Sequence, residues 1–574
     1  MKSIKIAARI ICFITLLCGT LFLCTKLMMP TWLNFNNDDT VKQFYREPPH
    51  SIETLFLGTS QVVNGISPIE LYDRFGISSY NLASQLQPML SSYYWLLEAH
   101  RIHSHSLRYI VLDPSYMFRG DERGDESSML PYNEIALTHM AFSTIKSEAL
   151  EACSEQYSSF SYIENLIPLL RYHSRWKELS SDDFRSVTNT INRFYTRGQN
   201  ITYDRMINTS PAEDMPLPRW DLTSASDYEE YQYTSLWTPK NQEYFIKIVS
   251  FCRNNNLKLI LLKLPKNWND HFHDAFDYLG RKYFLPIIDM NKASLQKEMG
   301  VFLPLDQMDD KHANIYGAIK YTDYIGKYLT THYSCTDVRT VPEMQHLKEQ
   351  SNLYYKMRQD GWLQNIQTLK AYCAVVAKDR YTIFAAANGE SSRYLTDNDR
   401  QALYNLGFLE LANLKYDHSY AGVRDKGTVV ADLQSSGFRD TIFIQGHLDF
   451  DGYLTISDIL SAKNDTAGNI VTNDEEDLFQ PAVGSGFFSI ESSSRNSSNK
   501  ASIIINGDDY SDEINGIHFV VFNHETRMIV DSSVFVPTAD GFDTRRYNNI
   551  NSAATYRKRM IHEENKYNSR SKVS

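Results

Sequence analysis

Short apolar runs alternate with helix-like segments along the first half of this 574-residue sequence, and this alternation limits the fold more than any other feature. The clearest run is Lys258–Leu264 (KLILLKL), which Pro265 ends. Strands that are apolar throughout are typical of parallel sheets, because helices cover both faces of such a sheet. The sequence therefore predicts an α/β domain in which a mostly parallel sheet lies between two helical layers.

The expected domain covers residues 51–334. We predict its strands at 52–58, 79–82, 109–113, 258–264 and 285–289. We predict its main helices near Pro68 and over 89–100, 241–254, 272–281 and 316–333. Residues 119–235 are less regular, and we interpret them as an insertion that caps a site.

A second, β-rich domain is predicted over residues 376–540. One hydrophobic core stops growing near about 250–300 residues, so a chain of this length is expected to hold at least two domains. The β-type runs lie at 381–386, 441–445, 501–505, 517–522 and 528–535, with one helix at 397–406 and a Ser/Asn-rich loop at 489–498. A helical linker over 335–375 is expected before this domain, and a polar tail over 541–574 after it.

The N-terminal segment is apolar and carries no charge from Ile10 to Leu23. With its flanks it offers about 20 residues, so we predict a transmembrane helix within residues 1–29. Lys2, Lys5 and Arg9 precede the run, which predicts a cytoplasmic N-terminus and a single-pass protein whose bulk lies outside the cell membrane. Residues 30–50 would then form a polar stalk. A cleaved signal peptide is the alternative, although no small-residue cleavage site follows the run.

Composition excludes some classes of protein. The net charge is −11, which argues against a general nucleic-acid binder, because such proteins need a basic surface. The seven cysteines form no C-x-x-C pair and show no metal-ligand spacing, so we expect no disulfide scaffold and no metal or other cofactor.

Ser60 follows the first predicted strand in the phrase Leu57-Gly58-Thr59-Ser60. A serine in that position lies at the carboxyl edge of the sheet, where open α/β sheets build their sites, and its own backbone N–H can stabilise an oxyanion. A plain turn with a helix cap would give the same pattern.

Asp309 and His312 form a D-x-x-H pair just before the last predicted helix of the domain. A serine hydroxyl becomes a nucleophile when a histidine takes its proton, and a carboxylate holds that histidine in the right tautomer. Asp310 could replace Asp309 in this role, and a surface loop with a capping aspartate remains the simpler interpretation of the pair alone.

Asn81 ends the second predicted strand. Its side-chain amide could donate into an oxyanion hole at the same edge of the sheet. A turn asparagine at the end of a strand would have the same place in the sequence.

The order of these motifs resembles the SGNH (GDSL-like) hydrolase superfamily. The matching phrases are FLGTSQVVNGISP, SSYNLASQLQPMLSSYYWLLEAHR, KLILLKLPKN and DDKHANIYGAIKYTDYIGKYL. They are most similar to the cell-envelope branch that includes the D-alanyl transfer and alginate O-acetylation proteins. The resemblance implies a flavodoxin-like three-layer domain with Ser60 as nucleophile, His312 as base, Asp309 as its orienter, and Asn81 with Ser60 as oxyanion donors. The sequence has no clear counterpart of the superfamily's separate oxyanion glycine.

The second domain resembles the ILEI/PANDER-like domain. The similar phrases are NKASIIINGDDYS and NGIHFVVF, followed by MIVDSSVF. The resemblance implies a carbohydrate-binding or interaction role, and a purely structural appendage is the alternative.

These features lead to one main hypothesis of function. The chain is expected to be a serine O-acyltransferase, with acetyl as the group transferred, that modifies cell-surface polysaccharide. The resemblance implies that it works beside a membrane-bound O-acyltransferase. The alternatives are a carbohydrate or lipid esterase of the same fold and a non-catalytic scaffold that binds glycan.

Overall fold

The computed structural model divides into two compact units, residues 1–354 and 355–574. In the first unit it describes residues 2–28, 37–118, 130–156, 162–177, 179, 196–202, 239–266 and 270–354. In the second it describes 355–361, 363, 366, 368–437, 440–448, 454–464, 470–471, 486–495, 498–506, 508–511, 514–525 and 528–536. The predicted tail at 541–574 and most of the predicted insertion at 119–235 lie outside these residues.

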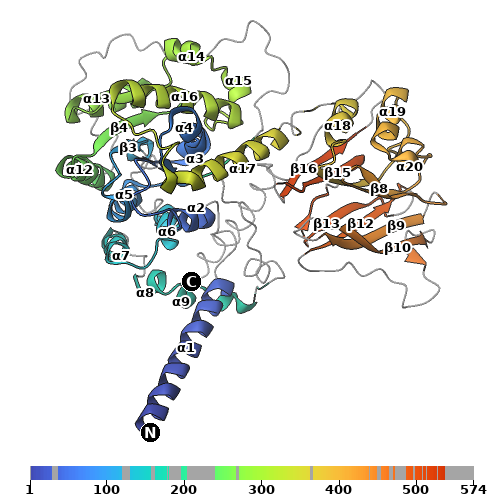
Figure 1. The fold of residues 1–574 in the computed structure, drawn as a ribbon, viewed down its shortest axis with the longest axis horizontal. Coiled ribbons are helices and arrows are strands. Elements are labelled where there is room, and N and C mark those ends of the chain that lie inside the picture. The colour runs from blue at the N-terminus through green and yellow to red at the C-terminus, as the bar shows by residue number, and fades with distance from the viewer. Residues whose placement is uncertain are drawn as a thin grey trace. The chain divides into compact units, whose positions relative to one another are not determined.

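A five-stranded sheet forms the centre of the first unit, with the strand order β2-β1-β3-β4-β5. Every neighbouring pair in it is parallel. The strands are β1 Thr54–Leu57, β2 Ser79–Asn81, β3 Tyr109–Leu112, β4 Lys258–Lys263 and β5 Ile287–Asp289. All five carboxyl ends therefore meet at one edge of the sheet. Figure 1 labels two of the strands, β3 and β4, side by side.

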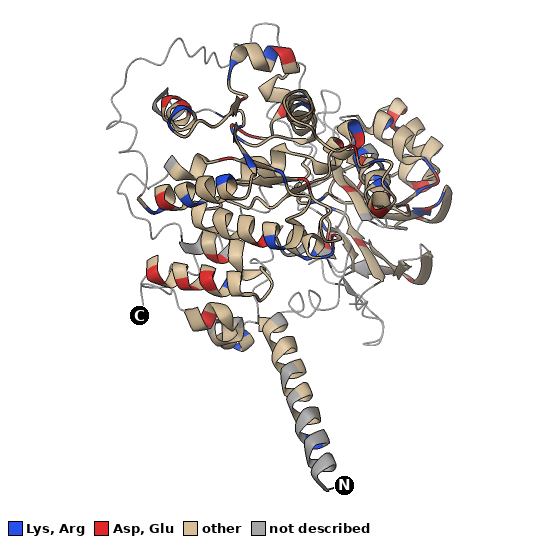
Figure 2. Ribbon diagram, turned by 60° about the vertical axis from the view of Figure 1, so that its left-hand side comes forward, with Lys and Arg blue, Asp and Glu red and all other residues tan. Residues whose placement is uncertain are grey.

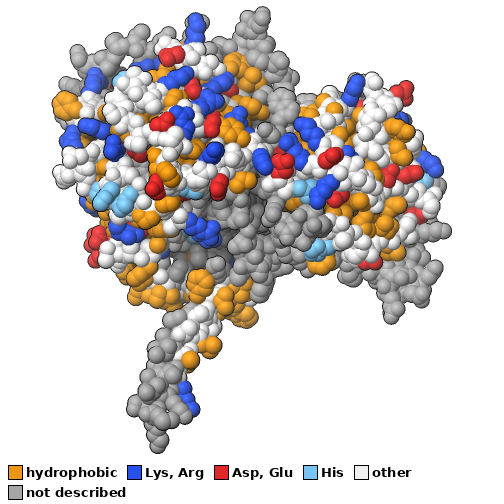
Figure 3. Space-filling model, viewed as in Figure 1, with side chains coloured by type: hydrophobic (Ala, Val, Ile, Leu, Met, Phe, Trp, Pro, Cys, Tyr) orange, Lys and Arg blue, Asp and Glu red, His pale blue; other side chains and the backbone are white. Residues whose placement is uncertain are grey.

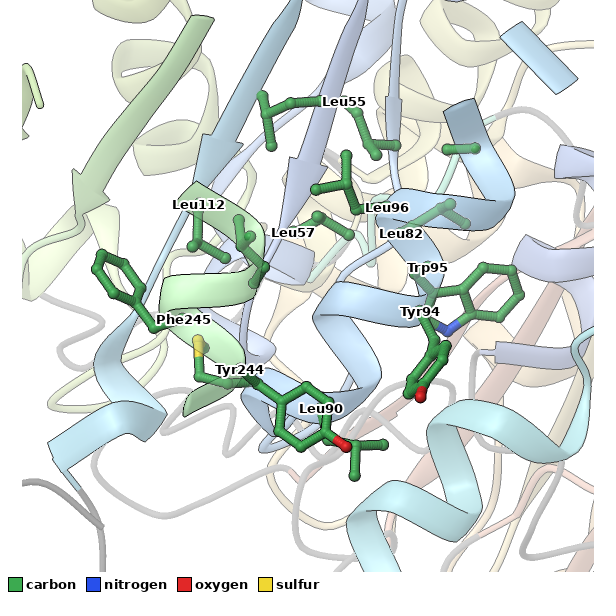
Figure 4. Close-up of a cluster of buried hydrophobic side chains, with 14 of the residues drawn as sticks. Leu55, Leu57, Leu82, Leu90, Tyr94, Trp95, Leu96, Leu112, Tyr244 and Phe245 are labelled. Atoms are coloured by element: carbon green, nitrogen blue, oxygen red, sulfur yellow. The ribbon is translucent and has the colours of Figure 1, made fainter. Parts of the chain in front are cut away.

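Helices pack on both faces of this sheet. On one face Leu55, Leu57 and Leu112 pack with side chains from α5 Met89–His103, α12 Pro239–Asn254 and α13 Asp270–Tyr283. Figure 4 shows part of that cluster, in which the leucines of the strands meet aromatic rings of α5 and α12. On the other face the alternate strand residues pack against α3 Ser60–Gly65, α4 Pro68–Phe75 and α16 Ile315–His332. The period-two alternation of strands thus supplies two separate cores.

Shorter helices complete the first unit. They are α2 Asn37–Phe44, η2 Ser115–Phe118, α6 Leu130–Thr138, α7 Thr144–Gln156, α8 Tyr162–Leu166, α9 Pro168–Tyr172, η4 His173–Lys177, α14 Ala293–Met299, α15 Leu303–Asp306 and η5 Pro342–Met344. Helix α17, Gln345–Gly361, runs across the boundary into the second unit.

The N-terminal segment forms helix α1, Lys2–Met28. Within the residues that the structure describes, no helix has the length and apolarity needed to cross a membrane. The prediction of a transmembrane helix within residues 1–29 is therefore wrong. It extended the apolar run into charged flanks: the uncharged stretch between Arg9 and Lys26 has 16 residues, 10 to 25. That stretch gives about 24 Å of helix, against a hydrocarbon core of ~30 Å.

The predicted stalk at residues 30–50 is also wrong where the structure describes it. Helix α2 packs into the first core, with Val41 5% and Phe44 0% exposed. The Phe44 ring lies edge-on to the rings of Tyr80 and Trp95. The composition of this segment is largely polar and therefore predicted a stalk. The burial of its two apolar side chains makes α2 part of the folded unit.

The second unit is a β-sandwich with helices on one side. One sheet has the order β16-β15-β6-β7-β8 and the other β11-β10-β9-β12-β13-β14, and neighbouring strands in both are antiparallel. The strands of the first sheet are β6 Tyr381–Ala387, β7 Tyr420–Asp425, β8 Thr428–Gln434, β15 Ile517–Asn523 and β16 Met528–Phe535. Those of the second are β9 Asp440–Leu448, β10 Leu454–Asn464, β11 Ile470–Val471, β12 Phe487–Ser493, β13 Ala501–Ile505 and β14 Asp508–Asp509.

Apolar side chains fill the space between these two sheets. The rings of Phe384 and Phe488 meet there with their centroids 4.9 Å apart. The other face of the five-stranded sheet packs against helices α18 Leu369–Val376, α19 Asp397–Leu406 and α20 Leu409–Ala412. The second unit is thus a three-layer helix–sheet–sheet arrangement.

The predicted loop at 489–498 is wrong over its first half. Strand β12 runs from Phe487 to Ser493 and pairs with both β9 and β13. Its Ile490 is buried, and the Ser492 hydroxyl donates to the carbonyl of Ala387. The serine-rich composition suggested a loop, but pairing on both sides and burial of most of its side chains stabilise a strand.

Figure 2 shows charged residues of both signs along the helices of the first unit. On the face seen in Figure 3, basic and acidic side chains are interspersed with hydrophobic ones. The net charge of −11 is therefore not gathered into one acidic patch on the described part of this face.

The packing of Trp95 gives a test of the first core. Trp95 is 2% exposed, and its indole N–H donates to the Ala136 carbonyl over 3.0 Å. We expect Trp95→Ala to lower the free energy of unfolding of the first unit by about 3–5 kcal/mol, because a large cavity remains. Phe142 is 80% exposed, so Phe142→Ala is the control, with an expected change within about 0.5 kcal/mol. Chemical denaturation of the two variants measures the difference, and equal losses would contradict this packing.

Candidate active site

The turn after β1 presents Ser60 at the carboxyl edge of the parallel sheet. Gly58 has a φ of 145°, which favours glycine, and Thr59 caps helix α3, of which Ser60 is the first residue. The Thr59 hydroxyl donates to Asp113 Oδ2 over 2.7 Å. Asp113 follows β3 and is 1% exposed. The turn that carries Ser60 is thus bound to the end of the neighbouring strand.

A compact loop before α16 presents His312. Gln307 and Ala313 form an antiparallel bridge across the loop, and the Met308 N–H donates to the His312 carbonyl over 3.0 Å. Asn314 caps α16 with its side-chain oxygen. The side-chain amide of Gln61 also donates to the Lys311 carbonyl over 3.0 Å, which joins the loop directly to α3.

Ser60 and His312, which are 252 positions apart in the chain, lie within hydrogen-bond distance. The Ser60 Oγ and the His312 Nε2 are 2.8 Å apart. The His312 Nδ1 lies 2.8 Å from Asp309 Oδ2 and 3.1 Å from Oδ1. Donation from Nδ1–H to the carboxylate leaves Nε2 as the acceptor for the serine proton, which is the tautomer that this network favours. The residues form a continuous Ser–His–Asp chain of contacts.

Asp309 is held in its ionised form. Burial alone would raise the pKa of this carboxyl, but the hydrogen bond and charge of His312, together with the backbone N–H groups of Lys311 and His312, lower it to about 2. Both N–H groups donate to Asp309 Oδ1, over 3.0 and 2.7 Å. Asp310 is exposed, so of the two aspartates considered as orienter the structure brings Asp309 to the histidine.

Asn81 ends β2 as predicted, but its side chain makes different contacts from those expected. It is 0% exposed, its Nδ2 donates to the Val62 carbonyl over 2.9 Å, and its Oδ1 accepts from the Ala83 N–H over 3.1 Å. The side chain supports the backbone of α3 and of the turn after β2, so it is not presented as an oxyanion donor. The prediction failed because the sequence places Asn81 at the sheet edge but does not say which backbone groups compete for its amide.

The backbone N–H of Ser60 remains available as an oxyanion donor. It is the first N–H of α3, and no acceptor for it exists among the residues that the structure describes. The first N–H groups of a helix have no partner within that helix. An oxyanion formed at Ser60 could therefore accept a hydrogen bond from the same residue.

Sequence reasoning missed several residues that hold this site. The Asn64 side chain donates to the Ser60 carbonyl over 2.9 Å and accepts from the Asn200 side chain over 2.7 Å. Asp113 was predicted only as the end of a strand, although the rule that parallel strands end at one edge could have indicated its contact with Thr59. No local signal in the sequence indicates Asn200.

Two other features bear on the chemistry. In the described ranges, no group of three or more His, Cys, Asp or Glu side chains could hold a metal ion. An open pocket lies at the start of β5, at the opposite edge of the sheet from Ser60. Its lining includes Asp277, Gly280, Arg281, Phe284, Leu285, Pro286 and Ile287. This lining lacks a nucleophile next to a base, so the Ser60 edge is the stronger candidate.

No family model matches this chain, and no curated protein matches its sequence. The case for a function rests on the geometry described above and on the sequence resemblance.

The space around Gly58 gives a test of the turn. A Cβ at Gly58 would lie 2.6 Å from the Asp113 Cβ, and a φ of +145° is strained for any other residue. We expect Gly58→Ala to lower the free energy of unfolding by about 2–4 kcal/mol.

Gly300 is a matched control for this variant. It also has a positive φ, +64°, but a Cβ at this position would meet nothing within 4 Å. Gly300→Ala should cost only about 1–2 kcal/mol, the strain of the left-handed backbone alone. Denaturant titration compares the two variants, and an equal or smaller loss for Gly58→Ala would contradict the close approach of Asp113.

Proposed function

We propose that this chain is a serine acyl-transferring enzyme that uses Ser60 as nucleophile, His312 as general base and Asp309 as its orienter. The observation that carries this proposal is the 2.8 Å contact between Ser60 Oγ and His312 Nε2, with Asp309 on the other ring nitrogen. A nucleophile, a base and a group that orients the base are the parts that covalent acyl transfer requires.

The reaction proceeds in two balanced steps. Ser60 Oγ attacks the carbonyl carbon of an ester donor, and its proton passes to His312 Nε2. The tetrahedral oxyanion takes a hydrogen bond from the Ser60 N–H, and the leaving alcohol departs with the proton from His312. In the second step an acceptor hydroxyl gives its proton to His312 and attacks the acyl-serine, which restores the Ser60 hydroxyl.

The acceptor decides between the two enzymatic functions. We propose a sugar hydroxyl of cell-surface polysaccharide as acceptor and acetyl as the acyl group, on the basis of the resemblance to the cell-envelope O-acyltransferases. A membrane-bound O-acyltransferase would then supply the acyl group. The second candidate is an esterase, because the His312 and Asp309 side chains are 15% and 24% exposed and water can reach them.

The second unit is proposed to bind glycan. Its support is the resemblance of its strands to the ILEI/PANDER-like domain. Three tyrosines on this unit, Tyr394, Tyr404 and Tyr416, are also 38%, 56% and 64% exposed. An exposed tyrosine ring offers an apolar face with a polar tip, which suits the mixed surface of a sugar.

Active-site labelling tests the nucleophile. A fluorophosphonate probe should label the purified full chain on Ser60, and Ser60→Ala should abolish the labelling. Ser84 is a matched control, because it also lies at this edge of the sheet, where its N–H donates to the Gly58 carbonyl over 3.1 Å. Ser84→Ala should label as the unmodified chain does. A chain that fails to label, or that labels equally after Ser60→Ala, contradicts the proposal.

The ionisation of Asp309 gives a second test. The pKa of Asp309 is lowered to about 2. The carboxylate therefore stabilises the folded state fully above the ordinary pKa of an aspartate, and this stabilisation is lost only as the pH falls toward 2. Asp309 is thus charged, and able to orient His312, throughout the pH range of the assay. Asp309→Asn should therefore lower the hydrolysis of an aryl acetate by about 10²–10⁴-fold at every pH from about 5 to 8. Asp310→Asn should change the rate little. A defect shared by both variants, or one that disappears within this range, would contradict the role of Asp309.

Two acceptors distinguish transferase from esterase. The unmodified chain is given an aryl acetate with and without an oligosaccharide, and acetylated sugar is measured by mass spectrometry. Acetylated sugar that depends on Ser60 supports transfer, whereas release of acetate alone supports the esterase.

A further inference from the structure

A buried ion pair fixes the short segment Thr196–Thr202 against the first unit. Arg197 Nη1 lies 2.6 Å from Glu47 Oε2, and the two side chains are 1% and 2% exposed. The Arg197 Nε also donates to the Ser79 carbonyl over 2.8 Å, and its guanidinium lies over the Tyr80 ring at 5.1 Å. These contacts bind the segment to β2 and to the residues that follow α2.

The charge of Glu47 depends on this pair. Burial would raise the pKa of Glu47, but the charge and hydrogen bonds of Arg197 and His346 lower it to about 2. The His346 Nε2 lies 3.0 Å from the same oxygen, Oε2. A buried charge without a partner strongly destabilises the folded state, so replacing either Glu47 or Arg197 leaves the other as an uncompensated buried charge.

The same segment supports the helix that begins with Ser60. The Asn200 N–H donates to the Val63 carbonyl over 2.9 Å, and the Asn200 side chain donates to Asn64 Oδ1 over 2.7 Å. Asn64 in turn donates to the Ser60 carbonyl over 2.9 Å. Helix α3 has six residues, so most of its carbonyls lack a partner within the helix and need one from outside.

A second route runs through Asn81. The Arg197 carbonyl accepts from the Asn81 N–H over 3.1 Å, and the Asn81 side chain donates to the Val62 carbonyl. The approach is close, because a Cβ at Gly198 would lie 2.0 Å from the Asn81 carbonyl oxygen. Arg197 is thereby linked to α3 by two routes, through Asn200 of its own segment and through Asn81 of β2.

The far end of the segment reaches the second catalytic element. The Thr202 carbonyl accepts from the Ile315 N–H over 2.8 Å, and Ile315 is the first residue of α16, directly after the loop that carries His312. One seven-residue segment thus contacts both the helix of the nucleophile and the start of the helix behind the base.

We propose that Arg197 and Glu47 are positioning residues for Ser60, because their ion pair fixes the segment 196–202 that holds α3 relative to the His312 loop. This proposal rests on the proposed acyl transfer, and it adds a distant pair that sets the geometry of that site. Small displacements of a nucleophile reduce the rate of reaction strongly, whereas substrate binding depends on other contacts.

The first test compares two buried glutamates of the same unit. Glu98 is 0% exposed, pairs with Arg101 over 2.8 Å and lies in the second half of α5. Glu47→Gln should lower kcat for an aryl acetate by about 10–100-fold with KM little changed. Glu98→Gln should keep kcat within about twofold, even where it lowers the melting temperature as much. Equal kcat losses in the two variants, or none in Glu47→Gln, would overturn the proposal.

A double variant separates positioning from stability. Replacing both charges, as in Glu47→Leu with Arg197→Met, leaves neither member of the buried pair without its partner, and His346 is 27% exposed and can be solvated by water. The melting temperature should therefore return toward that of the unmodified chain. The rate should stay low, because the contact of Arg197 with the Ser79 carbonyl is lost. Recovery of kcat together with stability would overturn the proposal.

Amide hydrogen exchange gives a readout that does not depend on activity. In Glu47→Gln the amides of Val63 and Asn64 should exchange faster, and in Glu98→Gln they should not. Unchanged exchange in Glu47→Gln would overturn the positioning role. If the fluorophosphonate probe did not label the unmodified chain, the proposed function would be contradicted. The exchange result would then decide by itself whether the ion pair positions α3.

Discussion

The parallel pairing of β1 with its two neighbours is the constraint on which the chemistry of the first unit depends. The register sets Phe56 opposite Asn81 on one side and opposite Val111 on the other. All three strands therefore end at one edge, and the turn after β1 meets the residue after β3. An antiparallel β3 would place Asp113 at the other edge, and the turn that carries Ser60 would lose its anchor.

Much of this arrangement could be predicted because it depends on nearby residues. Apolar runs located the five strands, two of which end at Gly58 and before Pro265, and Pro68 marked the start of a helix. The D-x-x-H spacing places Asp309 beside His312 within one loop. The contact between Ser60 and His312 was expected from the resemblance to the SGNH hydrolases, whereas the parallel-sheet rule located only Ser60 at the carboxyl edge of the sheet.

The remaining features depend on contacts between distant segments. Glu47 and Arg197 are about 150 positions apart, and nothing near either residue indicates that they pair in a buried place. Helix α2 is buried and β12 is a strand because of packing partners that composition does not reveal. For the same reason the Asn81 amide was expected to donate to an oxyanion, whereas it donates to the Val62 carbonyl. The apolar N-terminal run was overextended, because its length was counted across charged flanks.

The central claim is that Ser60 is a nucleophile that carries an acyl group. Mass spectrometry of the full chain, quenched in acid during turnover of an aryl acetate, tests it directly. The account predicts an added mass of one acetyl group, located on the peptide that contains Ser60 and absent when His312 is replaced by alanine, because His312 takes the Ser60 proton in the acylation step. An adduct on another residue, or turnover that persists after Ser60→Ala without any adduct on the unmodified chain, would contradict it.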